Sequence, residues 1–161
     1  MPFSYFSTNF NLQIMKKTAI LLLVLFVTLS CDKKQVYSDF ENEIDSQRWY
    51  EKDVKTHNFE ILEEDKNYNV FIEISHVRGT EMDEFPVEVK LQKSENIPYL
   101  KTVIINLNDK DCLGDICDSK ILVFENVSYK KGKYKVSFSP KSNYGFVPNI
   151  IGVGLTVEIK E

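Results

Sequence analysis

Cys31 is the residue whose surroundings point most clearly to a chemical modification. It follows an apolar run from Ala19 to Leu29, and that run follows the two lysines Lys16 and Lys17. A positive start, an apolar core and a small residue just before a cysteine are typical of a bacterial lipoprotein signal peptide. We therefore expect residues 1–30 to be removed and Cys31 to carry acyl chains, palmitate among them, that hold the mature chain at a membrane surface.

An ordinary secretory signal peptide and a buried hydrophobic helix are the alternative interpretations of this segment. A strict lipoprotein signal has leucine three residues before the cysteine, where this chain has Thr28. The apolar run is shorter than the roughly 20 residues that a membrane-spanning helix needs. Residues 1–14 carry no charged side chain and Met15 begins a conventional signal peptide, so we interpret 1–14 as a mis-assigned translation start. Residues 31–35 are expected to form a short tether.

Cys112 and Cys117 are an even pair once Cys31 is assigned to lipid. The exported compartment permits disulfides, and Gly114 between the two cysteines allows a tight turn, so we expect a bridge. A ring this short is worth only about 2 kcal/mol, which makes the bridge a local clamp. Two free buried thiols remain the alternative.

The acidic segment 108–118 could offer carboxylates to a calcium ion. An EF-hand loop that began at its second residue would place Leu113 and Lys120 where oxygen ligands are needed, so only a calcium site of another type stays open. His57 and His76 have no second ligand at metal spacing, and we expect both to be surface or core-edge residues in strands. No metal and no cofactor is predicted.

Carboxylate pairs such as Glu63 with Glu64, and Asp83 with Glu84, fall in expected turns. Solvated charge clusters are commoner there than the acid and nucleophile of a glycosidase, which remains a third hypothesis. The chain also lacks the usual zinc-protease, hydrolase, phosphate-binding and dinucleotide-binding motifs. The sequence therefore argues against an enzyme.

Charge and length describe the expected mature body. Removal of residues 1–30 leaves 131 residues, which is the size of one domain. The same removal leaves 18 basic and 24 acidic residues, a formal net charge of −6. An acidic balance argues against nucleic acid as a partner, because phosphates attract clustered basic residues.

The elements that would position these residues are strands. From Val36 to Glu161 apolar and polar residues alternate with period two, and helical periodicity is scarce. Six or seven short strands without helices between them predict an all-β fold, an antiparallel β-sandwich over residues 36–161 with jelly-roll or immunoglobulin-like topology. The clearest runs are Tyr68–Ile74, Phe85–Gln92, Leu100–Leu107, Ile121–Phe124, Lys133–Phe138 and Ile151–Ile159.

Three of these runs, and one segment before them, carry more specific expectations. Leu100–Leu107 is apolar on both faces, which is typical of a central strand. Pro86 suggests a strand beginning or an edge. Gly152 and Gly154 share one face and leave room for a neighbouring backbone or a large aromatic ring. Asp39–Arg48 is the one segment that could be helical.

Aromatic residues near the expected loops raise the possibility of a glycan-binding surface, since sandwich domains stack rings on sugars. Aromatics at strand ends that cap the core are the alternative. The candidates are Trp49, Tyr50, Tyr99, Tyr129, Tyr144 and Phe146.

Several pieces of the mature chain share the order of one known family: Cys31 and then Val36-Tyr37, Trp49, the Tyr68–Ile72 strand, Gly114–Ile116, Gly132–Tyr134 and the Pro148–Glu158 ending. On these pieces the mature chain resembles the GldH-type gliding-motility lipoproteins of the Bacteroidetes. Asn149, Gly152 and Thr156 depart from that family's ending, which has glycine, aspartate and arginine there.

The resemblance implies a non-enzymatic, lipid-anchored component of the gliding apparatus that faces the periplasm and contacts other motility proteins of the envelope. Cys31 is the one residue to which the resemblance assigns a role, that of the acylation site. A glycan-binding lipoprotein of the surface or periplasm is the alternative function.

Overall fold

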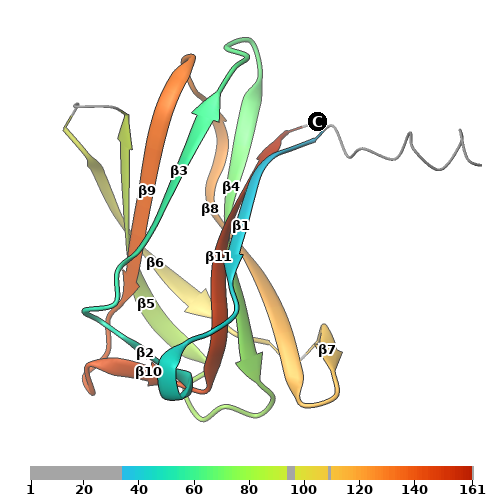
Figure 1. Ribbon diagram of the computed structural model, residues 1–161, viewed down its shortest axis with the longest axis vertical. Coiled ribbons are helices and arrows are strands. Elements are labelled where there is room, and N and C mark those ends of the chain that lie inside the picture. The colour runs from blue at the N-terminus through green and yellow to red at the C-terminus, as the bar shows by residue number, and fades with distance from the viewer. Residues whose placement is uncertain (1–33, 94–96, 109, 161) are drawn as a thin grey trace, which may run out of the picture. The chain divides into compact units, whose positions relative to one another are not determined.

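The computed structural model describes residues 34–93, 97–108 and 110–160 (Figure 1). The expected signal peptide and Cys31 lie outside the described residues. Those described fall into one compact unit, Lys34–Glu161. Within them, no helix has the length and apolar character needed to cross a membrane.

Two antiparallel sheets and a short two-stranded ribbon make up the fold (Figure 1). The five-stranded sheet has the order β1-β11-β4-β8-β7, and the four-stranded sheet has the order β3-β9-β5-β6. The ribbon pairs β10 with β2. The strands are β1 (Gln35–Glu41), β2 (Arg48–Tyr50), β3 (Lys55–Ile61), β4 (Asn67–Val77), β5 (Glu84–Lys93), β6 (Tyr99–Asn106), β7 (Cys112–Leu113), β8 (Ile116–Ser128), β9 (Gly132–Pro140), β10 (Phe146–Pro148) and β11 (Ile150–Ile159).

The core lies between the facing sheets, and alternation along each strand fills it. β3 shows the pattern plainly, because every odd-numbered residue from Lys55 to Ile61 is buried and every even-numbered one is exposed. Burying one large apolar side chain contributes about 1.5–3 kcal/mol, so this interior is the main source of stability. Its largest fully buried members include Trp49, Tyr68, Phe85, Phe138, Ile72 and Leu155. The predicted all-β antiparallel sandwich is thus confirmed.

The glycine prediction for β11 is also confirmed. An added Cβ at Gly154 would lie 2.5 Å from Cδ2 of Phe40, and one at Gly152 would lie 2.6 Å from Cε1 of the same ring. Phe40 pairs directly with Gly154 across β1 and β11. The two glycines therefore make the space in which β1 packs.

The prediction for Leu100–Leu107 is wrong, because β6 is the last strand of its sheet. Its inward residue Ile105 is fully buried, but Leu100 and Ile104 on the other face are exposed. The strand is therefore apolar on both faces although it has a neighbouring strand on one side only.

Three other segments differ from expectation. Asp39–Arg48 is not a helix: β1 continues to Glu41, and only the 3₁₀ turn η1 (Asp45–Gln47) follows. The expected strand Ile121–Phe124 is part of the longer β8. The tether ends earlier than expected, since Gln35 already pairs with Glu158.

Pro86 lies near the start of β5, as predicted. β5 is nevertheless an interior strand, between β9 and β6. The pairing of β5 with β9 begins only at Val87, opposite Pro140, so the missing N–H of Pro86 interrupts no bond in that pairing.

Candidate functional site

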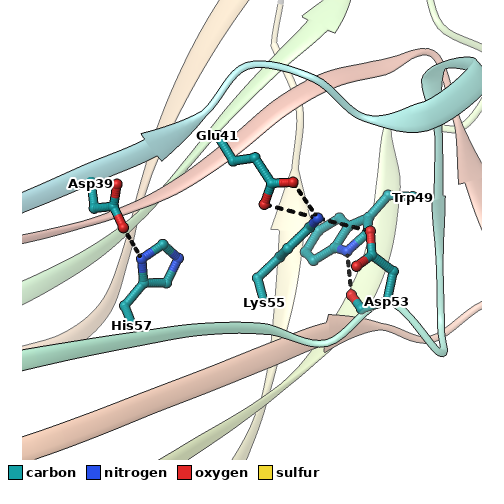
Figure 2. Close-up of polar contacts among 6 residues, drawn as sticks. All are labelled: Asp39, Glu41, Trp49, Asp53, Lys55 and His57. Atoms are coloured by element: carbon teal, nitrogen blue, oxygen red, sulfur yellow. Dashed lines mark hydrogen bonds and ion pairs between the residues drawn. The ribbon is translucent and has the colours of Figure 1, made fainter.

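The edge strands β1 and β3 face each other along one open side of the sandwich and are joined by three side-chain rungs. Tyr37 packs on Phe59 with ring centroids 5.9 Å apart. Asp39 Oδ2 lies 3.2 Å from His57 Nδ1, and Glu41 Oε2 lies 2.9 Å from Lys55 Nζ (Figure 2). We call these six residues the edge ladder. In each of the three contacts one residue belongs to β1 and the other to β3. These strands belong to different sheets, so the edge ladder joins the two sheets along this side.

Lys55 occupies an inward position of β3 and is 9% exposed. Its ammonium contacts Glu41 and also Asp53, whose Oδ2 lies 2.9 Å from Nζ (Figure 2). Burial lowers the pKa of Lys55, but the hydrogen bonds and charges of these two carboxylates outweigh it, and the pKa is raised. Trp49 fixes the same corner, because its Nε1 donates to the Asp53 carbonyl at 3.0 Å. Lys55 is thus held as a fully charged cation.

His57 is the other polar residue that points inward from β3, and it is 6% exposed. Its Nδ1 faces Asp39 Oδ2, and the Tyr37 hydroxyl lies 3.3 Å from both atoms. The opposite ring atom, Nε2, has no hydrogen-bond partner among the described residues, and the ring stacks on Phe138. Burial lowers the pKa of His57 despite the nearby Asp39 carboxylate, so the neutral ring is favoured.

Tyr37 completes the polar part of the ladder. Burial, together with the Asp39 charge and hydrogen bond, raises the pKa of the Tyr37 hydroxyl to about 12. The hydroxyl therefore stays protonated and can donate to Asp39 Oδ2.

These protonation states suit a structural clamp better than acid–base catalysis. A nucleophilic lysine needs a lowered pKa, and the pKa of Lys55 is raised. A histidine base needs a reachable nitrogen, and His57 has one nitrogen engaged by Asp39 and the other covered by the core. The edge ladder holds the two sheets together.

Both histidines lie in strands, as predicted, but they are buried and do not lie at the surface or the core edge. His76 is fully buried, and its Nε2 lies 3.4 Å from Ser119 Oγ. The edge ladder itself was not anticipated. A signal existed in β3, where Lys55 and His57 occupy the same alternating positions as apolar Phe59 and Ile61.

Cys112 and Cys117 face each other across the β7–β8 hairpin, and the structure joins their sulfurs as a disulfide. Gly114 sits in the turn with φ +65°, a backbone angle that favours glycine. In the neighbouring acidic segment, Asp118 accepts a hydrogen bond from the Ser75 hydroxyl. Across the described residues, no three or more His, Cys, Asp or Glu side chains gather closely enough to hold a metal ion.

The aromatic residues considered for a glycan surface do not form one platform. Trp49 lies in the short strand β2 and Tyr129 in the loop after β8, at or near loops as expected, and both side chains are buried in the core. Tyr50 and Phe146 pair on the β2–β10 ribbon. Tyr144 is exposed in the loop before β10. Trp49 and Tyr129 therefore fit the alternative interpretation, aromatics at strand ends that cap the core.

A second feature missed from the sequence is the outer edge of β6. The strand has eight residues, and of these only Ile105 is buried. Leu100 is 60% exposed and Ile104 is 55% exposed. An exposed, apolar edge strand of this length is a candidate surface for protein contacts.

Comparison with known proteins supports the family suggested by the sequence. The family model described as GldH lipoprotein matches residues 35–157, which is almost all of the described body. The chain belongs to the GldH lipoprotein family. A relative, the gliding motility lipoprotein GldH of Flavobacterium johnsoniae, is 26% identical over 159 residues, covering 91% of this chain and 98% of the relative. The resemblance to the GldH-type lipoproteins is therefore confirmed.

Among solved structures, dimeric latent PorU from Porphyromonas gingivalis aligns with a TM-score of 0.35 and 8% identity. The alignment covers 79% of this chain and 13% of the PorU chain.

Proposed function

We propose that this GldH-family chain is a non-catalytic component of the bacterial gliding machinery, anchored in the cell envelope by lipid and acting through protein–protein contacts. The family match over residues 35–157 carries this proposal, because it spans the folded body and not a short motif. The relative from Flavobacterium johnsoniae is itself named as a gliding motility lipoprotein, and the two chains align over nearly their whole lengths.

The chemistry of the described body supports a role in binding. Two of its buried ionisable groups, Lys55 and His57, join β3 to β1, and Lys55 is kept charged while His57 is kept neutral. Meanwhile Leu100 and Ile104 remain exposed on an edge strand. Lys55 and His57 are used inside the fold, and Leu100 and Ile104 are exposed apolar residues. Exposed apolar residues favour contact with another protein.

The lipid anchor is proposed at Cys31, three residues before Lys34. Three residues span at most about 10 Å, so an acylated Cys31 keeps the start of β1 close to the membrane. The body would then face the periplasm and meet its partners in two dimensions, which raises their effective concentration. The Cys112–Cys117 disulfide fits the same oxidising compartment.

Deletion and complementation of the gene in its own bacterium test the motility role. We expect the deletion to stop surface spreading and the movement of surface adhesins along the cell, and the wild-type gene to restore both. Growth rate in liquid culture is the control, because a motility component should leave it unchanged. Normal spreading and adhesin movement in the deletion strain would argue against the proposal.

A further inference from the structure

The start of β1 and three loops lie together at one end of the sandwich. The Lys34 carbonyl accepts the N–H of Ile159 at 2.8 Å, and the Asn67 carbonyl accepts the N–H of Lys160 at 2.8 Å. The pairing of the strands places the β3–β4, β5–β6 and β8–β9 loops at this same end (Figure 1). We call the described residues of these loops and chain ends the anchor end: Lys34, 62–66, 97–98, 129–131 and Lys160.

The opposite end, which we call the far end, is well separated from it. The two ends are about 34 Å apart, because the ten residues of β11 each advance about 3.4 Å. Ile116 of the β7–β8 hairpin pairs with Val77, the last residue of β4, and so lies at the far end. The described loop residues there are 42–47, 51–54, 78–83, 107–108, 110–111, 114–115 and 141–145.

The two ends carry opposite charge. Among the described residues, the anchor end has five basic and three acidic side chains. The described loops of the far end have four basic and eight acidic side chains. The body is acidic as a whole, yet its positive charge is concentrated at the end from which the chain leads back to Cys31. A positive surface is attracted to anionic lipid headgroups, and a negative one is repelled.

The most accessible positive charges of the anchor end are in the β8–β9 loop, where Lys130 and Lys131 are exposed. Acidic neighbours in the β3–β4 loop are engaged by other groups. Glu63 pairs with Lys66 at 2.8 Å, and the Glu64 carboxylate accepts the backbone N–H of Lys131 at 3.0 Å. The ammonium groups of Lys130 and Lys131 are therefore available to an outside partner.

Apolar side chains project from the same loops. Ile97, in the loop before β6, is 95% exposed, and Leu62, in the loop after β3, is 65% exposed. Tyr99, the first residue of β6, is exposed beside them in sequence. Apolar and aromatic side chains combined with lysines are typical of surfaces that enter the headgroup region of a bilayer. The far end also exposes Leu113 and Tyr144, but in acidic surroundings.

We propose that the anchor end is a membrane-contact surface, with Leu62 and Ile97 in the headgroup region of a phospholipid bilayer and its lysines on anionic headgroups. This inference rests on the proposed function, since acyl chains at Cys31 bring the surface to the bilayer. At most about 10 Å of chain separates Cys31 from Lys34. The acyl chains and the loop tips together fix the orientation of the body, so that the far end points away from the membrane.

Fluorescence quenching by brominated lipids tests this orientation with the full, lipidated chain. The protein is reconstituted in vesicles of equal parts phosphatidylglycerol and phosphatidylcholine, brominated near the headgroup end of the acyl chains. Tryptophan replaces one exposed residue at a time, as Leu62→Trp, Ile97→Trp or Leu113→Trp. Leu113 is the matched control, because it is 90% exposed and lies at the far end. The native Trp49 is fully buried and supplies a constant background.

Bromine quenches tryptophan only at close range. Leu62→Trp and Ile97→Trp should therefore lose most of their added fluorescence in the brominated vesicles, and Leu113→Trp should keep its fluorescence. Because all three positions are exposed, the three proteins should have the same emission maximum in detergent, and circular dichroism checks that each is folded.

Charge reversal in the Ile97→Trp protein tests the contact with anionic headgroups. Lys130→Glu together with Lys131→Glu should weaken the quenching in these vesicles and have little effect in phosphatidylcholine alone. Lys52→Glu together with Lys110→Glu changes two exposed lysines of the far end and should leave the quenching unchanged. Equal quenching in the two double variants would overturn the contact between the lysines and anionic lipid.

The remaining outcomes overturn the inference in distinguishable ways. A protein that floats with the vesicles but is not quenched at both Leu62 and Ile97 would reject the membrane-contact surface and leave the lipid anchor intact. Quenching at Leu113 as strong as at Ile97 would show that the body lies on its side, which also rejects the proposed orientation. A wild-type chain that does not float with vesicles would reject the acyl anchor, and with it both proposals.

Discussion

Lys55 and His57 are two residues apart on β3, and burial acts against the charge of both. Lys55 keeps its charge because two carboxylates contact its ammonium. His57 has one carboxylate at Nδ1, and an additional proton at Nε2 would have no acceptor among the described residues. β3 therefore holds a charged Lys55 beside a neutral His57. The difference comes from the number of carboxylates: Lys55 contacts two, Glu41 of β1 and Asp53 before β3, and His57 contacts one, Asp39 of β1.

Acid should destabilise the fold through His57. Its pKa in the folded protein is below the ordinary value of 6.5, so the unfolded chain binds more protons in this range. The free energy of unfolding must then fall as the pH drops through 6.5 toward the lower, folded pKa, by at most about 1.4 kcal/mol per pH unit for one group. Thermal unfolding followed by circular dichroism between about pH 7 and about pH 5 measures this slope, above the range in which ordinary carboxylates titrate.

His57→Gln is the variant that isolates this residue, since glutamine fills similar space and does not titrate. The melting temperature of the variant should depend less on pH over that window than the melting temperature of the wild type. An equal slope in the two proteins would show that another group is responsible.

At the scale of the elements, β1 is the strand on which the attachment of the body depends. It lies at the edge of the five-stranded sheet, next to β11, and begins one residue after Lys34. Phe40 fits over Gly152 and Gly154 on one face of this sheet, and the edge ladder binds β1 to β3 on the other side of the strand. Both contacts add to the backbone pairing with β11 that holds the first strand of the body in its sheet.

Gly154→Ala should weaken the packing of β1. The new methyl group would lie 2.5 Å from the Phe40 ring and 2.6 Å from the Asp39 carbonyl oxygen, so one of them must move. Overpacking of this kind costs about 1–3 kcal/mol in the free energy of unfolding. Denaturant titration of the purified protein gives the value.

Phe40→Ala supplies the control for that prediction. In this background the contact with the ring is gone and the contact with the Asp39 carbonyl oxygen remains, so the cost of Gly154→Ala should be smaller than in the wild type, and the double-mutant cycle measures the difference. Equal costs in both backgrounds would mean that the ring and the glycine do not oppose each other.

For the whole molecule, the three cysteines divide between attachment and local structure. Cys31 is proposed to carry lipid, and the structure joins Cys112 to Cys117. The mature wild-type protein should therefore have no thiol that reacts with an alkylating reagent before reduction and two after it. A reactive thiol in the unreduced protein would contradict either the acylation or the bridge, and peptide mass mapping would tell which.

In the same cells, Cys31→Ala should fail to be processed as a lipoprotein and should leave the lipidated membrane fraction.

Much of the fold could be predicted from the alternation of residues, because one buried face forces a period of two on each strand. The strands around Tyr68–Ile74 and Ile151–Ile159 are present as expected, and so is the room beside Gly152 and Gly154. The position of β6 could not be predicted, since alternation reports which residues are apolar and not which strand is a neighbour. For that reason the sequence predicts Leu100–Leu107 as a central strand, whereas Leu100 and Ile104 are exposed on an edge strand.

The sequence by itself determined the all-strand class, the family and the expected site of attachment. The class and the attachment site depend on residue types in a short window, such as the alternation in β11 or the apolar run before Cys31, and the family depends on the order of matching pieces along the body. Only the tertiary structure decided which residues meet across the two sheets. Asp39 reaches His57 and Glu41 reaches Lys55 because β1 and β3 are edges of different sheets on the same side of the sandwich, and that placement follows from the packing of the whole chain.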